Sequence, residues 1–182
     1  MINPVRRKVF ISYYKGDQEA VQAFADKYSD VFITKALGIG YDPQLIDSND
    51  TEYVMGRIRT EFLADSTVTI VLVGSCTHSR RYVDWEIKAS LRQGSVYTPN
   101  GLLGIMLPGN SSVYLPRRFE LNWERGEQNC YARFRHMPAT KDDLRRWIED
   151  AFEARTTRAH LIENPQDRMG YNGKCLVHGV TH

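Results

Sequence analysis

Short apolar stretches recur along the chain and predict buried β-strands. Three of them are almost continuously apolar and end at turn-forming residues: 8–13, 68–73 and 102–107. Uninterrupted apolar character, rather than period-two alternation, is typical of a central strand that is covered on both faces. Weaker apolar groups at 31–33 and 131–134 are candidates for a second strand and for a last, outer strand.

Between these stretches, apolar residues recur at the three-to-four-residue spacing of amphipathic helices. The expected N-cap is Asp17 for the first of these helices, Asp50 or Thr51 for the second, and Thr140 for the last. Thr140 is expected to form a capping box with Asp143. The apolar faces of the four predicted helices are Val21, Phe24, Ala25 and Tyr28; Val54, Ile58 and Phe62; Val83, Ile87 and Leu91; and Leu144, Trp147, Ile148, Ala151 and Phe152.

Strands that alternate with helices predict an α/β sandwich with a mostly parallel central sheet. The segment 38–50 is rich in Gly, Pro, Asp and Asn and is predicted to be a loop, and the pattern over 110–135 is weak. We see no linker or repeat, so residues 1–164 are predicted to form a single domain. Residues 165–182 lack periodicity and are expected to be a loose tail or a strap packed on the core.

Composition narrows the class of protein. Of 182 residues 42% are hydrophobic and 25% charged, and the net charge is +2, which fits a globular domain without a basic arm for nucleic acid. No stretch approaches the length of a transmembrane helix, and the basic start lacks the apolar stretch of a signal peptide. We therefore expect a cytoplasmic protein with neither a nucleic-acid nor a membrane partner.

The three cysteines are odd in number and far apart, which argues against a disulfide framework and for a reducing compartment. Cys76 lies close to His78, but no second ligand pair follows at a zinc-site spacing, so no metal site is predicted.

Ligands of open parallel sheets gather at the carboxyl ends of the strands, here 12–17, 38–50 and 74–86. There is no P-loop, and Gly38-Ile39-Gly40 is followed by Pro43 where a dinucleotide fingerprint needs glycine. The strand that ends at Val73-Gly74 lacks the terminal Asp of a phospho-receiver domain. Ser75 and Cys76 are not in a nucleophile elbow, which favours a structural role for both.

Glu86 is the candidate functional carboxylate in these segments. It is expected on the border of the helical stripe formed by Val83, Ile87 and Leu91, near the carboxyl end of the preceding strand. From there it could enter a cleft, or it could be a solvated residue near the helix N-terminus. Asp84 is expected about 160° away on the same helix, in solvent.

Three segments resemble the TIR-like domains of the Thoeris antiphage system. They are Phe10-Ile11-Ser12-Tyr13 with Asp17, the run 65–74, and the helix segment 79–87 that contains Val83-Asp84-Trp85-Glu86-Ile87. The likeness spans about residues 8–108. It implies a flavodoxin-like fold and an NAD-consuming site whose essential glutamate is Glu86. Many enzymatic TIR domains place Trp three residues before this glutamate, whereas Trp85 immediately precedes it here.

The chemistry that the resemblance implies suits a single carboxylate. Cleavage of the nicotinamide–ribose bond passes through an oxocarbenium-like transition state, and nicotinamide leaves neutral, so no general acid or metal is needed. NAD is then a substrate rather than a cofactor. The expected substrate-binding residues are Ser12, Tyr13, Tyr14, Lys15, Ser75, Arg80 and Trp85. Alternatively, Ser12 only satisfies a turn and Arg80 is an ordinary solvated side chain.

The resemblance also implies a product and partners. A cyclic ADP-ribose-type signal would reach a separate effector protein after a phage-derived trigger, whereas water as acceptor would give ADP-ribose. A weak homo-oligomer is expected, with Tyr97, Tyr114 and Trp123 as candidate contacts. Two other hypotheses about the function stay open. The protein could be a non-enzymatic TIR-like interaction module, or a nucleoside deoxyribosyltransferase that forms a covalent sugar intermediate.

Overall fold

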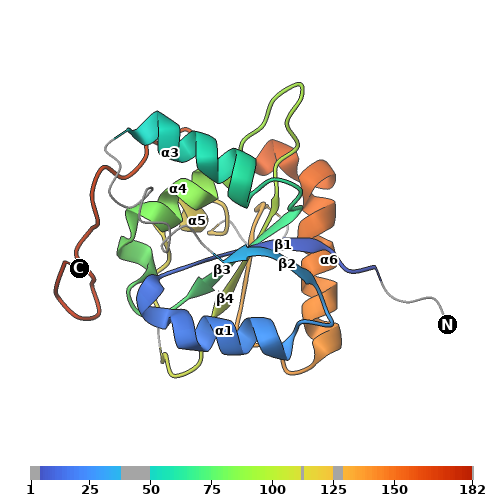
Figure 1. Ribbon diagram of the computed structural model, residues 1–182, viewed down its shortest axis with the longest axis horizontal. Coiled ribbons are helices and arrows are strands. Elements are labelled where there is room, and N and C mark those ends of the chain that lie inside the picture. The colour runs from blue at the N-terminus through green and yellow to red at the C-terminus, as the bar shows by residue number, and fades with distance from the viewer. Residues whose placement is uncertain (1–4, 38–49, 112, 125–128, 182) are drawn as a thin grey trace.

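A computed structural model of the protein describes residues 5–37, 50–111, 113–124 and 129–181 (Figure 1). Its centre is a five-stranded, all-parallel sheet in the order β2-β1-β3-β4-β5. The strands are β1 (Lys8–Tyr13), β2 (Ile33–Leu37), β3 (Val68–Val73), β4 (Gly101–Met106) and β5 (Arg133–Arg135). This order is that of flavodoxin-like domains, and the predicted fold class is confirmed.

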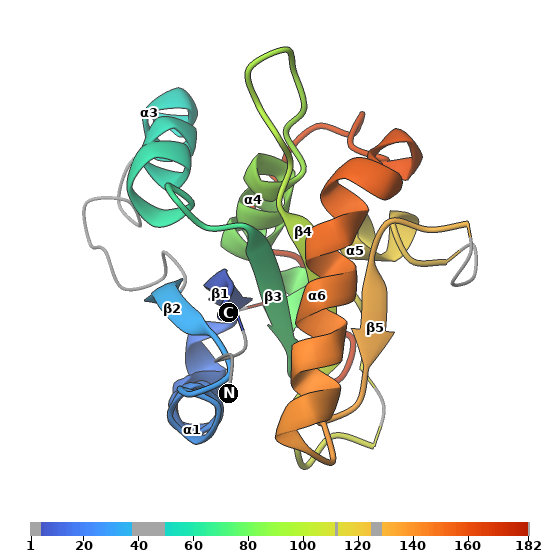
Figure 2. The ribbon, with the colours of Figure 1, turned by 90° about the vertical axis from the view of Figure 1, so that its right-hand side faces the viewer.

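Helices cover both faces of the sheet, as the two views in Figures 1 and 2 show. On one face lie α1 (Gln18–Lys27) and α6 (Lys141–Thr157), and on the other lie α3 (Thr51–Arg57), α4 (Arg81–Ser90) and α5 (Arg117–Leu121). Single turns complete the described elements: η1 (Lys15–Asp17), the π-helical η2 (Ile58–Phe62), η3 (Thr77–Ser79) and η4 (Ala159–Leu161).

Strand β3 shows why the central stretches are continuously apolar. Ile70 and Leu72 pack in the core cluster beneath α1 and α6, whereas Val71 and Val73 pack in the cluster beneath α4 and α5. Successive side chains therefore enter different layers, and both layers are dry. Gly101, at the start of β4, lets α6 approach the sheet, since a Cβ there would lie 1.9 Å from the carbonyl oxygen of Ala151.

The central strands were predicted within one residue, and the capping box of Thr140 and Asp143 is present at the start of α6. The second and last strands begin two residues later than predicted. The reason is that the apolar pairs 31–32 and 131–132 are buried core residues that precede β2 and β5. Helix α5 was not predicted, because one turn is too short to show a period. The predicted loop 38–50 lies outside the described residues except for Asp50, which caps α3.

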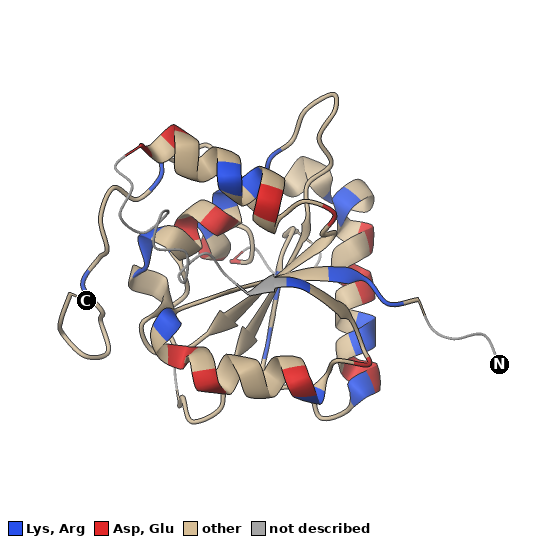
Figure 3. Cartoon of the chain, in the orientation of Figure 1, with Lys and Arg blue, Asp and Glu red and all other residues tan. Residues whose placement is uncertain are grey.

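Residues of both charge signs are spread along the helices in the view of Figure 3. Among the described residues, no helix has the length and apolar character needed to cross a membrane.

Candidate functional site

The strand order creates a switch point between β1 and β3. The chain leaves β1 towards β2 on one side and leaves β3 towards β4 on the other, so the two following loops diverge at the carboxyl edge of the sheet. In open α/β sheets this crevice is where ligands bind. The loop after β1 contains Tyr14 and η1, and the loop after β3 contains Gly74, η3 and Arg80.

Ser12 and Glu86 meet at this switch point. Pleating sends Ile11 and Tyr13 to the α1 side of β1, and Phe10 and Ser12 to the α4 side. The Ser12 hydroxyl donates a 2.5 Å hydrogen bond to Oε2 of Glu86, and both side chains are buried, with 0% and 1% exposure. A carboxylate is thus held in a dry environment at the edge where a ligand of this fold is expected.

Helix α4 is more deeply buried than its sequence indicates. Glu86 was expected on the border of the apolar stripe, but it lies within the protein, as do Asp84 and Trp85. The expectation of a solvated Asp84 is wrong: its carboxylate accepts hydrogen bonds from Arg118 Nε at 2.9 Å and Nη2 at 3.4 Å, and from the Met169 amide at 2.9 Å. The periodicity of the helix could not show this, because the groups that cover it come from β1, from Arg118 and from residues 163–173.

A cation lies beside the loop after β1. The Arg80 guanidinium is 4.0 Å from the centre of the Tyr14 ring and only 7% of the residue is exposed. Burial lowers the pKa of Arg80, and burial also raises the pKa of Asp17, against the opposing charges of Arg80 and His178. Asp17 packs on Gly74, where a Cβ would lie 2.3 Å from the carboxylate. This group of side chains joins the two loops of the switch point.

The remaining predicted site residues are placed differently. Tyr13 is buried in the core cluster on the α1 side, on the opposite face of β1 from Ser12. The Trp85 indole donates to the Met169 carbonyl at 2.8 Å and packs in a cluster with Phe10. Lys15 is exposed on η1, and Ser75 is half-buried in the loop after β3. Ser12, Tyr14, Arg80 and Glu86 therefore lie near the switch point, whereas Tyr13 packs in the core and Trp85 borders a separate pocket formed with Arg81 and residues 167–171.

The C-terminal segment is a strap over α4, and sequence reasoning missed how it is attached. Arg118, buried in α5, donates to Asn164 and to the carbonyls of Gln166 and Asp167 as well as to Asp84. Further along, the Arg81 amide donates to Asn172 at 3.1 Å, and the Gly173 amide to the Ser79 carbonyl at 2.8 Å. In Figure 1 this segment runs in red beside the start of α4.

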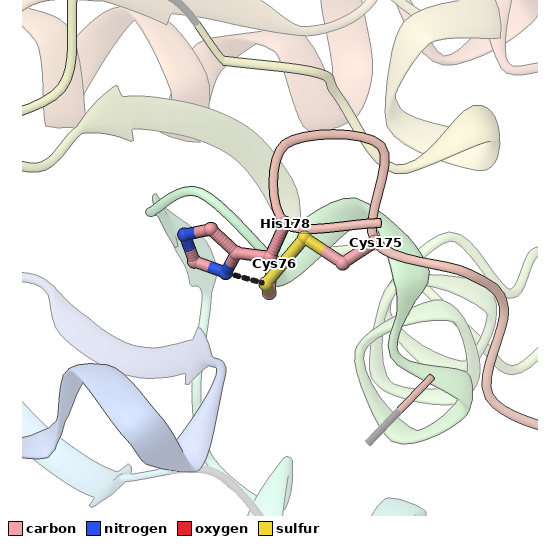
Figure 4. Close-up of side chains that lie close together, drawn as sticks. All are labelled: Cys76, Cys175 and His178. Atoms are coloured by element: carbon pink, nitrogen blue, oxygen red, sulfur yellow. Dashed lines mark hydrogen bonds between the residues drawn. A yellow bond between two sulfur atoms is a disulfide. The ribbon is translucent and has the colours of Figure 1, made fainter. Parts of the chain in front are cut away.

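The expectation that the cysteines stay unpaired is also wrong. Cys76, in the loop after β3, is bonded to Cys175 in the strap, and His178 lies beside them (Figure 4). A separation of 99 residues gives no spacing signal that could have revealed this pair. The sulfur atoms and the His178 ring nitrogen all lie within 4.8 Å of one another, a grouping that could also hold a metal ion.

Of the aromatic residues considered for self-association, Tyr97 and Tyr114 are about half exposed. Trp123 is only partly exposed and packs edge-on against Phe134, with ring centres 5.6 Å apart.

The parallel 2-1-3-4-5 sheet with helices on both faces defines a flavodoxin-like domain. The family model of the TIR-like domain of the Thoeris protein ThsB matches residues 10–112, more than half of the chain, and the chain belongs to this family. The match runs from β1 to just beyond β4, so α5, α6 and the strap lie outside it. No curated protein matches the chain.

Proposed function

We propose that the protein cleaves the nicotinamide–ribose bond of NAD and transfers the ADP-ribosyl group to an acceptor within the same nucleotide, giving a cyclic ADP-ribose-type product. The observation that carries this proposal is the Ser12–Glu86 pair: a buried carboxylate at the β1/β3 switch point of a TIR-like domain.

Glu86 has the properties that the reaction requires. Positive charge develops on the ribose as nicotinamide departs, and a carboxylate in a dry site stabilises that charge more strongly than one in water. The Ser12 hydroxyl already shows that Glu86 accepts a hydrogen bond from an alcohol. A ribose hydroxyl that replaces Ser12 would make the same bond and bring the reacting sugar against the carboxylate.

The diphosphate of NAD needs donors and positive charge. Arg80 is held against Tyr14 at the junction of the two loops, and the exposed Lys15 opens the following turn. A buried guanidinium interacts strongly with phosphate because it has already lost much of its hydration. Ser75, at the end of β3, is the next polar side chain along this edge.

In this proposal the product diffuses to a separate effector protein, and a phage-derived trigger starts the reaction in the cytoplasm. Weak self-association through the exposed Tyr97 and Tyr114 could complete the site. If NAD neither binds nor reacts under triggered conditions, the domain acts instead as an interaction module.

The test is incubation with NAD, alone and with extract from phage-infected cells, followed by mass spectrometry of the nucleotides. Glu86→Gln keeps the size of the side chain but removes its charge, and product formation should fall about 10²–10³-fold. The matched control is Glu153→Gln, the same change at an exposed position of α6 on the other side of the sheet. Undiminished conversion by folded Glu86→Gln protein, or an equal loss in both variants, would refute the assignment.

A further inference from the structure

We propose that Cys76, Cys175 and His178 form a thiol–disulfide exchange site whose co-substrate is a dithiol, and that reduction there releases the turn 174–181 from the loop after β3. The turn and its disulfide are shown in Figure 4. This inference does not depend on NAD chemistry.

The geometry distinguishes the two sulfur atoms. His178 Nδ1 lies 3.1 Å from Cys76 Sγ, a hydrogen-bonding distance for sulfur. The turn holds the imidazole there through its own backbone bonds, from the Cys175 amide to the Val180 carbonyl at 2.8 Å and from the Gly179 amide to the Cys175 carbonyl at 2.7 Å. An imidazole that donates to a sulfur stabilises its thiolate, so Cys76 is the better leaving group.

The exchange reaction needs no co-reactant other than the dithiol. Cys175 is 0% exposed, so the turn must first open. One thiolate of the dithiol then attacks Cys175 Sγ, the Cys76–Cys175 bond breaks, and Cys76 leaves as a thiolate that accepts a proton through His178. The second thiol of the reductant then attacks its own sulfur in the mixed disulfide and frees Cys175, which is protonated in turn. Two electrons and two protons pass to the protein, and the reductant departs as a disulfide.

Release is expected to be local because Cys175 is the buried residue of the turn 174–181 and its other residues are exposed. Leu176, Val177 and Val180 are 60%, 46% and 48% exposed, and the Leu176 amide donates to His78 at 3.0 Å. The preceding part of the strap, 163–173, is held separately by Arg118 and by α4. Reduction should therefore divide the strap into a fixed part and a released turn.

The released turn would change the surroundings of the switch point. Asp17 packs on Gly74 between the two loops, and Cys76 follows two residues after Gly74. Reduction removes the covalent link at Cys76, whereas the Gly173 amide still binds the same loop through the Ser79 carbonyl. Any effect on NAD turnover rests on the proposed function, whereas the release of the turn does not.

The test is hydrogen exchange by mass spectrometry on the full chain, oxidised and after reduction with dithiothreitol in the presence of a chelator. Deuterium uptake should rise in 174–181 on reduction and stay unchanged in 163–173. Cys175→Ser should show the high uptake without reductant. His178→Ala should slow reduction about tenfold, since the leaving thiolate loses its donor. His160→Ala, an exposed histidine outside the site, is the matched control and should leave the rate unchanged.

Three results would overturn the proposal. The first is a turn that stays protected after both cysteines become reactive to iodoacetamide. The second is an equal rate of reduction in the parent and His178→Ala. The third, in a parallel sample without chelator, is a stoichiometric zinc ion on the reduced protein that keeps the turn protected, which would make the cluster a metal site instead.

Discussion

Replacing Asp84 with Asn should be among the most damaging conservative substitutions in the protein. The Asp84 carboxylate is the anionic partner of Arg118, and the two side chains are 9% and 1% exposed. It accepts two hydrogen bonds from the guanidinium and one from the Met169 amide. An asparagine turns one acceptor atom into a donor that faces other donors, and it leaves Arg118 charged in a dry environment.

The expected cost follows from that environment. Breaking a buried ion pair from one side typically costs about 3–5 kcal/mol, because the remaining charge has no compensation. For a chain of this size, that corresponds to a fall in Tm of about 6–20 °C. The matched control is Asp142→Asn, which removes an exposed ion pair with Arg145 on α6 and should cost less than about 1 kcal/mol.

The assay is urea denaturation of four proteins: the parent, Asp84→Asn, Arg118→Met, and the double variant. The two changes share one interaction, so together they should cost less than the sum of their separate costs, by about 0.5–3 kcal/mol. Hydrogen exchange should show faster uptake at 163–173 in each single variant. A loss below about 1 kcal/mol in Asp84→Asn, or strictly additive costs, would show that the pair does not hold the strap.

Three further predictions concern stability. Ile148→Ala should cost about 2–5 kcal/mol by denaturant melts, since this side chain is 2% exposed beneath the sheet, and a loss below 0.5 kcal/mol would contradict that placement. Gly101→Ala should lower Tm strongly or prevent folding, because the new methyl group meets the Ala151 carbonyl of α6, while Gly170→Ala, with open space around it, should be tolerated. Burial raises the pKa of Asp17 above 3.8, so the folded protein binds this proton more tightly than the unfolded chain, and the contribution of this one group to stability falls as pH rises above 3.8. The stability of Asp17→Asn relative to the parent should therefore increase between pH 3 and pH 7, and a difference that stays constant or shrinks over this range would contradict the direction.

The elements that the sequence predicts best are those whose signal is local. The strands 8–13 and 68–73 lie between helical layers, so each needs an unbroken apolar stretch that is visible without any knowledge of its neighbours. The start of α6 is equally visible, because the capping box of Thr140 and Asp143 satisfies helix N–H groups within a few residues. The position of Glu86 near the carboxyl edge of the sheet is predicted in the same local way, from its place in the helix that follows strand 68–73.

The features that were missed depend on partners distant in sequence. The helical period places Asp84 about 160° from Glu86, on the side expected to face solvent. Arg118 and the strap cover its carboxylate in the folded protein. Cys76 and Cys175 are brought together by the path of a segment without periodic pattern. Such pairings depend on tertiary packing, which a helical period does not encode.

The covalent link also has a consequence for the unfolded chain. The bond between Cys76 and Cys175 closes a ring that contains α4, β4, α5, β5 and α6, and it leaves β1, α1, β2, α3 and β3 outside. In the chain-entropy description, closing a ring of roughly 100 residues lowers the free energy of the native state relative to the denatured ensemble by about 4–5 kcal/mol. An oxidised chain in urea is then more compact, exposes less new surface on unfolding and should show a shallower denaturation slope than the reduced chain. The slope of the unfolding free energy against urea concentration would thus report whether the two sulfur atoms are oxidised or reduced.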